Sequence, residues 1–129
     1  MAKDYFNKDE RLTNLISEVI NENSEFSHLR NLNIKGITHS KKKKSKSKIV
    51  YADTEKLNDK HHFLTGIDFI ITFYPESRNL DSVHLKRLIF HELLHVGYDP
   101  EKEKKYIVPH DVEDFKALID KFGTDWIRN

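Results

Sequence analysis

The stretch "HLKRLIFHELLHVGYDP", residues 84–100, places two histidines and a glutamate within one of the most apolar segments of the chain. Between Asp81 and Gly97 the apolar residues surround most of a helical axis, so we expect a buried helix there. Asp81 is a good N-cap and Gly97 a good C-terminal stop for that helix. Burying titratable side chains is costly unless they are paired or bind a metal. The segment therefore predicts a polar cluster that a further interaction stabilises.

His91 and His95 are four residues apart and therefore lie on one face of the helix, a turn apart. Two imidazoles in this arrangement can hold one zinc ion, and Glu92 can polarise a water bound to the same metal. The competing interpretation is a partly exposed helix with incidental His and Glu, which the apolar context disfavours. The metzincin class is excluded, because Glu101 occupies the position of its third histidine and Met1 is the only methionine.

A catalytic zinc usually needs a third protein ligand, which the sequence places downstream of the helix. His110 is the best candidate, fifteen positions after His95, because the chain can end the helix and fold back. Pro109 opens a predicted final helix, and His110 would lie at its start. Glu113 and Asp114, on the next turn of that helix, remain reserve candidates.

Hydrophobic periodicity predicts the remaining elements. Residues 8–23 carry apolar side chains at helical spacing, which indicates an amphipathic helix covering a sheet. Residues 29–40 and 48–57 are typical of two strands that form a hairpin with a basic tip. Residues 59–64 indicate a turn or a helical turn. Residues 66–76 form the strongest predicted strand, which a proline ends, and its two apolar faces indicate that both are covered at least in part.

The run "KKKKSKSK", residues 41–48, holds six lysines. The formal net charge of the chain is +1, so removing these six charges leaves −5 for the remainder. The simplest interpretation is a solvated loop at a hairpin tip. The alternative is a weak contact with nucleic acid or another polyanion through Lys41–Lys48. No aromatic residue is interleaved with these lysines, so the run itself does not support stacking on bases.

The length and composition of the chain limit the number of domains and the classes of site that it can contain. The 129 residues fit one domain with a modest core. The chain contains no cysteine, which rules out disulfides, thiolate zinc sites and a thiol nucleophile. Its first ten residues are polar, so we expect no signal peptide. No apolar run approaches the roughly 18 residues of a membrane span, and we therefore expect a cytoplasmic protein without membrane contact.

The motif "HELLHVG" (residues 91–97), followed by "VPHDVEDF" (residues 108–115), resembles the putative phage metallopeptidase family, a group of small zincin-like proteins of phages and prophages. The likeness extends over "FLTGIDFIITF" (residues 63–73) and more loosely over the lysine-rich hairpin. It therefore covers most of the chain from about residue 30. The spacing from His95 to His110 is also similar to that of SprT and Spartan-type zincins, which cleave proteins on DNA.

This resemblance implies an α+β fold, with residues 1–129 forming a single zincin-like metallopeptidase domain. The implied minimal zincin fold has an N-terminal helix, a three-stranded and mostly antiparallel sheet, the zinc-binding helix and a C-terminal helix. The resemblance also implies zinc held by His91, His95 and His110, with Glu92 as the catalytic base.

Together these features predict a zinc-dependent metallopeptidase that hydrolyses peptide bonds in a protein or peptide substrate, in the host cell cytoplasm if phage encoded. Zinc lowers the pKa of its water to about 7, and Glu92 takes the proton and passes it to the leaving amine. In zincins an edge strand beside the zinc helix pairs with extended substrate, and we expect residues 67–74 to be that strand.

Two other classes of function stay open. One is a zinc-binding module without turnover, and the other is a phage protein that binds nucleic acid or a host protein. Glu92 favours the enzyme, because metal binding alone does not need it.

Overall fold

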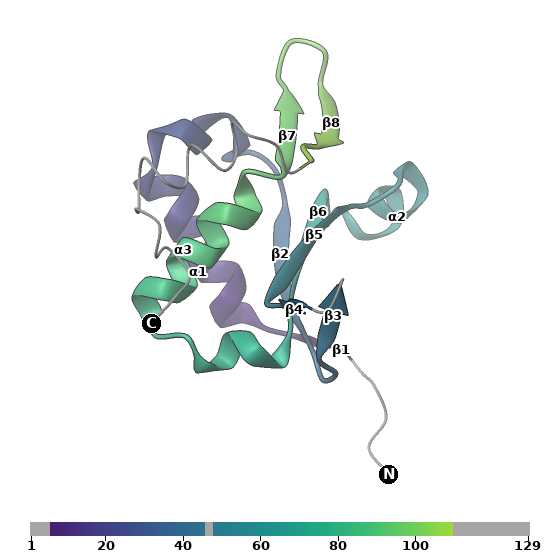
Figure 1. Ribbon diagram of the computed structural model, residues 1–129. Helices are drawn as coiled ribbons and strands as arrows, with labels where there is room; N and C mark the ends of the chain where they lie inside the picture. The colour runs from purple at the N-terminus through teal and green to yellow at the C-terminus, as the bar shows by residue number, and fades with distance from the viewer. Residues whose placement is uncertain (1–5, 46–47, 110–129) are drawn as a thin grey trace.

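The computed structural model describes residues 6–45 and 48–109 and shows a mixed α+β architecture (Figure 1). The described helices are α1 (Glu10–Glu22), α2 (Asp59–Thr65) and α3 (Ser82–Leu93), with two short 3-10 helices, η1 (Ser24–Leu29) and η2 (Pro75–Asn79). The main sheet has four strands in the order β1 (Phe6–Lys8), β2 (Ile34–His39), β6 (Phe69–Phe73) and β5 (Ala52–Lys56). Two small antiparallel pairs are β3 (Lys43–Ser45) with β4 (Lys48–Val50), and β7 (Val96–Asp99) with β8 (Lys104–Ile107).

The main sheet is antiparallel at two of its three pairings, because β2 and β6 run parallel. The predicted α+β class is therefore confirmed. The predicted three-stranded sheet is wrong, since the main sheet of the described residues has four strands. The predicted hairpin between residues 29–40 and 48–57 is also wrong. Strand β6 lies between β2 and β5, and part of the lysine run forms the separate β3–β4 pair.

Strand β6 occupies the centre of the sheet, so the expectation that residues 67–74 form the edge strand is wrong. The sequence of β6, "FIITF", is buried at four of its five positions, as a strand covered on both faces requires. Strand β5, "ADTEK", carries three charged side chains, which are typical of a sheet edge. Edge strand β5 is the one that packs against α3.

Helix α1 confirms the amphipathic helix predicted over residues 8–23. Asp9 caps it by accepting a hydrogen bond from the backbone of Leu12 at 3.1 Å. The helix packs closely on β2, where a Cβ added to Gly36 would lie 3.0 Å from Cβ of Leu12. The Gly36 amide also donates to Oγ1 of Thr13 at 3.0 Å, so glycine at this position brings helix and strand together.

Helix α3 begins as predicted and ends earlier than predicted. Asp81 is its N-cap and accepts a hydrogen bond from the backbone of His84 at 2.8 Å. The helix ends at Leu93, so the prediction of Gly97 as its C-terminal stop is wrong. Gly97 lies in β7 instead, where a Cβ would come within 2.2 Å of the ring of Tyr106 on β8. The charged segment that follows the helix forms this β7–β8 hairpin.

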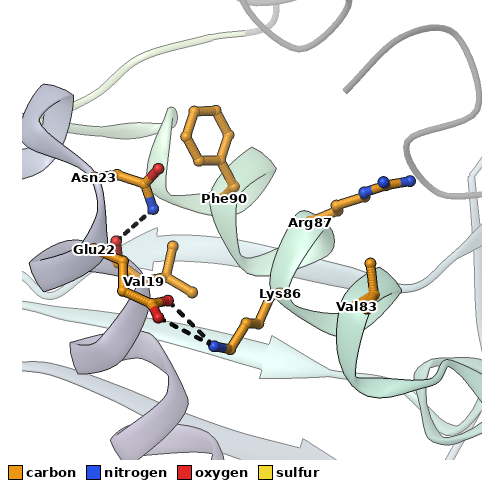
Figure 2. Close-up of a pocket in the computed structure, with 7 residues that line it drawn as sticks. All are labelled: Val19, Glu22, Asn23, Val83, Lys86, Arg87 and Phe90. Atoms are coloured by element: carbon orange, nitrogen blue, oxygen red, sulfur yellow. Dashed lines mark hydrogen bonds and ion pairs between the residues drawn. The ribbon is translucent and has the colours of Figure 1, made fainter. Parts of the chain in front are cut away.

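Helices α1 and α3 lie side by side on one face of the sheet, and α2 projects from the other side (Figure 1). Their contact closes the core, which joins apolar residues from both helices, η1 and the main sheet. A groove of about 310 Å³ lies between them, and Lys86 of α3 pairs there with Glu22 of α1 at 3.2 Å. Figure 2 shows the residues that line this groove, among them Phe90. The next residue of α3, His91, is turned about 100° from Phe90 around the helix axis.

The short segment 59–64 forms helix α2, capped by the side chain of Asn58 and ended by Gly66 at a positive φ of 75°. In the described ranges no helix is long and apolar enough to cross a membrane. The predicted C-terminal helix after Pro109 lies outside the described residues.

Asp68 fastens three segments together just before β6. Its Oδ2 accepts a hydrogen bond from the backbone of Asn33 at 2.7 Å, and its Oδ1 accepts from Nζ of Lys105 on β8 at 2.7 Å. His62 of α2 approaches the same Oδ1 at 3.0 Å. Burial alone would raise the pKa of the Asp68 carboxyl, but the bonds from Asn33 and Lys105 outweigh it and lower that pKa below 3.8.

We predict that Asp68 makes the stability of the protein depend on acid pH. A carboxyl with a depressed folded pKa stabilises the fold above its ordinary pKa of 3.8, and this stabilisation is lost as the pH falls through the folded pKa. Replacing Asp68 by Asn should lower the free energy of unfolding at neutral pH by about 2 kcal/mol and reduce its loss at acid pH. Urea unfolding of both proteins across this pH range measures the effect.

Asp59→Asn is the matched control, because it removes the same charge from an exposed position in the first turn of α2. An Asp68→Asn variant with the stability and pH dependence of the parent protein would contradict the prediction.

Candidate metal centre

The end of α3 and the turn that follows it bring together the three side chains that the sequence selected. His91 and Glu92 lie in the last turn of α3, whereas His95 lies in the turn between the end of the helix at Leu93 and β7. His91, Glu92 and His95 are 9%, 4% and 8% exposed, and their candidate ligand atoms all lie within 4.8 Å of one another. The two imidazole rings meet edge to face, with centroids 5.1 Å apart. Two imidazoles and a carboxylate are donors that suit zinc and several other divalent metals. The cluster therefore fits a single metal ion.

A backbone carbonyl fixes the orientation of His95. Its Nδ1 lies 2.6 Å from the carbonyl oxygen of Val108, and the Val108 amide donates to the backbone oxygen of His95 at 2.8 Å. Because a carbonyl can only accept, the ring nitrogen Nδ1 must carry the proton. The lone pair is then on Nε2, which is the arrangement that a metal-binding histidine needs.

Glu92 is held by a residue of the edge strand. Thr54 of β5 donates its hydroxyl to Oε1 of Glu92 at 2.7 Å, and the same hydroxyl lies 3.3 Å from the backbone oxygen of Glu92. The other carboxylate oxygen, Oε2, lies 3.9 Å from Nε2 of His91. The hydrogen bond therefore ties one oxygen of the carboxylate to the sheet, while the other remains on the side of the histidine pair.

The sequence pattern does not indicate that Thr54 or Val108 belongs to the site. Thr54 resembles any threonine of a polar edge strand, and Val108 acts through its backbone carbonyl. Both contacts join positions more than ten residues apart, so only the tertiary fold reveals them.

An open cleft of about 360 Å³ gives access to the cluster. One wall comes from edge strand β5 together with one residue each of β3 and β4, and the floor carries Glu92 and His95. The other wall comes from the end of β8 and the two residues after it. Its lining residues are Lys43, Val50, Ala52, Asp53, Thr54, Glu92, His95, Ile107, Val108 and Pro109. A segment of extended peptide can therefore lie between β5 and residues 107–109, next to the cluster.

The candidate third ligand His110 lies outside the described residues, as do the reserve candidates Glu113 and Asp114. The chain reaches the cleft at Val108 and Pro109, which both line it, and position 110 follows directly. The expected path, in which the chain folds back to the zinc helix after β8, is thus followed as far as Pro109.

Comparison with known protein families shows to which family the chain belongs. The model of the putative phage metallopeptidase family matches residues 4–129. The chain belongs to this family. The match confirms the resemblance seen in the two motifs and extends it to the N-terminal strand and helix. No curated protein and no solved structure matches the chain.

We predict that the hydroxyl of Thr54 stabilises the buried carboxylate of Glu92. Thr54→Val keeps the shape of the side chain but removes the donor, and leaving a buried carboxylate oxygen without it should cost about 1–3 kcal/mol. Thr54→Ser keeps the hydroxyl and should stay close to the parent protein. Urea unfolding of the three metal-free proteins at neutral pH measures this difference. Equal stability of the valine and serine variants would show that the hydrogen bond does not matter.

Proposed function

We propose that this protein is a zinc-dependent metallopeptidase that hydrolyses peptide bonds with Glu92 as the general base. The observation that carries the proposal is the buried cluster of His91, Glu92 and His95 at the floor of an open cleft, in a chain of a metallopeptidase family. The expected substrate is an extended segment of a protein or peptide. Among the described strands β5 pairs only with β6 in the main sheet, and the cleft runs along its other side.

The proposed zinc ligands are His91, His95 and His110. Zinc suits two imidazoles four residues apart whose ring nitrogens lie close together, and a third protein ligand leaves one coordination position open for water or substrate. When bound, zinc lowers the pKa of a water to about 7 and polarises the scissile carbonyl. His110 is favoured as the third ligand because it follows Pro109, which already lines the cleft.

Glu92 is proposed to take the proton of the attacking water and to donate it to the leaving amine. The bond from Thr54 to Oε1 holds the carboxylate in place, and Oε2 lies on the side of His91. This arrangement supports a base that stays beside the attacking water throughout the reaction.

Edge strand β5 is proposed to bind the substrate main chain, in place of the residues 67–74 expected from the sequence. One side of β5 pairs with β6, and its other side faces the cleft. An extended peptide can add there by main-chain hydrogen bonds, which places a peptide bond next to Glu92 and the two histidines. Ile107 and Val108 on the opposite wall offer apolar contacts for its side chains.

The parent protein is predicted to bind one zinc ion per chain through three histidines. The variants His91→Ala, His95→Ala and His110→Ala should each lose most of the metal after dialysis, measured by elemental analysis. His61→Ala is the control, because this histidine is exposed on α2. Full occupancy in the His91 or His95 variant would contradict the site, and full occupancy in His110→Ala would assign the third ligand to Glu113 or Asp114.

A second prediction separates catalysis from metal binding. Glu92→Gln keeps the size and helix propensity of the side chain but removes the base. The variant should retain zinc and its fold while its rate of hydrolysis falls by a factor of about 10²–10⁴. Zinc content, thermal unfolding and cleavage of a substrate from a proteome-wide screen are the three measurements.

Cleavage by Glu92→Gln at the parental rate would show that Glu92 is not the base. A parent protein that cleaves nothing in the screen, yet binds a partner only when loaded with zinc, would instead identify a non-catalytic zinc-binding module.

A further inference from the structure

Three aromatic rings from separate strands meet beside the lysine run, although none lies within it. Phe6 and His39 are paired across β1 and β2, and their rings meet edge to face with centroids 4.4 Å apart. The ring of Tyr74, just after β6, follows with its centroid 5.8 Å from that of His39. Because β1, β2 and β6 are neighbours in the sheet, the three rings form a row across it. Strand alternation places this row on the face opposite α1 and α3.

Lys41, Lys42, Lys43 and Lys44 surround the same row. Together with the three rings they line an open hollow of about 370 Å³, and all four lysines are exposed. Nζ of Lys43 lies 5.5 Å from the centroid of Tyr74, within the range of a cation–π contact. We call the four lysines and three rings the basic aromatic hollow.

Two carboxylates hold two of the four lysines of the hollow. Lys42 pairs with Glu76 at 2.9 Å, and Lys43 pairs with Asp53. No carboxylate is among the described residues that line the hollow itself. The hydrogen bond to Asp53 raises the pKa of Lys43, which therefore stays charged. Burial, followed by the hydrogen bond to Asp53, raises the pKa of Tyr74 to about 12, so its ring stays neutral at physiological pH.

We propose that the basic aromatic hollow binds single-stranded nucleic acid. Lysines contact the phosphates without reading sequence, and exposed rings stack on bases whose faces are free. Phe6 is 60% exposed, so its ring is available to a base. A duplex hides its base faces, and an acidic peptide has no base to stack, so neither uses the row of rings. The two observations together therefore favour a single strand over other polyanions.

The hollow adjoins the metal cleft, because Lys43 lines both. Asp53 of the edge strand holds Lys43 and accepts a hydrogen bond from the hydroxyl of Tyr74 at 2.8 Å, and the next residue, Thr54, holds Glu92. A bound strand would thus lie against one end of the cleft. The proposal rests on the rings and lysines alone and does not require that the protein cleave peptides.

Fluorescence anisotropy of a labelled oligothymidylate tests the proposal with the full-length protein. Binding should weaken as the salt rises from about 50 mM to about 200 mM, since released counterions drive it. A hairpin duplex of equal charge and a polyglutamate of similar length serve as competitors. We expect both to displace the oligothymidylate far less effectively than unlabelled single strand does.

Two matched pairs of variants separate the charge from the rings. The double variant Lys41→Gln/Lys44→Gln removes two phosphate contacts. Because each contact with a single strand contributes about 0.7 to the slope of log affinity against log salt concentration, the slope should fall by about 1.4. Lys102→Gln with Lys104→Gln, in the exposed β7–β8 hairpin, removes the same charge and should leave the slope nearly unchanged.

Phe6→Leu keeps an apolar side chain but removes the ring, and it should weaken binding about fivefold or more. Phe63→Leu, on the exposed face of α2, is its control and should bind like the parent. Thermal unfolding verifies that all variants are folded.

Three results would overturn the proposal. They are the failure of the parent protein to bind single strand at low salt, equal competition by the duplex or by polyglutamate, and equal losses in the test and control variants. Zinc removal should leave the affinity unchanged, so these outcomes are independent of the metal site.

Discussion

The hydrogen bond from Thr54 to Glu92 is the interaction on which the candidate metal centre depends. It joins the edge of the sheet to the last turn of α3, and it gives a carboxylate that is only 4% exposed a partner from outside its own helix. A buried charge without such a partner would destabilise the fold. The same bond ties β5, which forms one wall of the cleft, to the helix residue Glu92 on the floor of the cleft.

Edge strand β5 serves two surfaces because successive side chains of a strand point to opposite faces. Thr54 faces α3 and holds Glu92, whereas Asp53 faces the other side and holds Lys43 and Tyr74. The metal centre and the basic aromatic hollow are therefore built on neighbouring residues of one short strand. A shift of this strand by one residue would exchange the two faces and disrupt both surfaces.

Local sequence patterns are sufficient for α1, for the start of α3 and for the three described residues of the site. The N-cap Asp81 and the i, i+4 spacing of His91 and His95 involve residues close together in the chain, so the sequence alone reveals them. Strand order depends on contacts between distant segments. The apolar faces of β6 were recognised, but they were not used to place it in the centre of the sheet, where such a strand belongs.

Three further features depend on contacts that the sequence does not display. The sequence pattern indicates Gly97 as a helix stop, yet glycine is required there because the ring of Tyr106 occupies the space of its Cβ in the β7–β8 hairpin. The lysine run lacks aromatic residues in sequence, but three neighbouring strands supply them in space. Val108 contributes a backbone carbonyl to His95, which no side-chain pattern can indicate.

The most direct test of the metal centre is a crystal structure of the zinc-loaded protein with anomalous diffraction data at the zinc edge. We expect one anomalous peak bound by Nε2 of His91 and Nε2 of His95 at about 2.0–2.1 Å. Thr54 should still donate to Oε1 of Glu92, and no oxygen of Glu92 should be bonded to the metal. A peak on Nδ1 of His95, or one bonded directly to the Glu92 carboxylate, would contradict it.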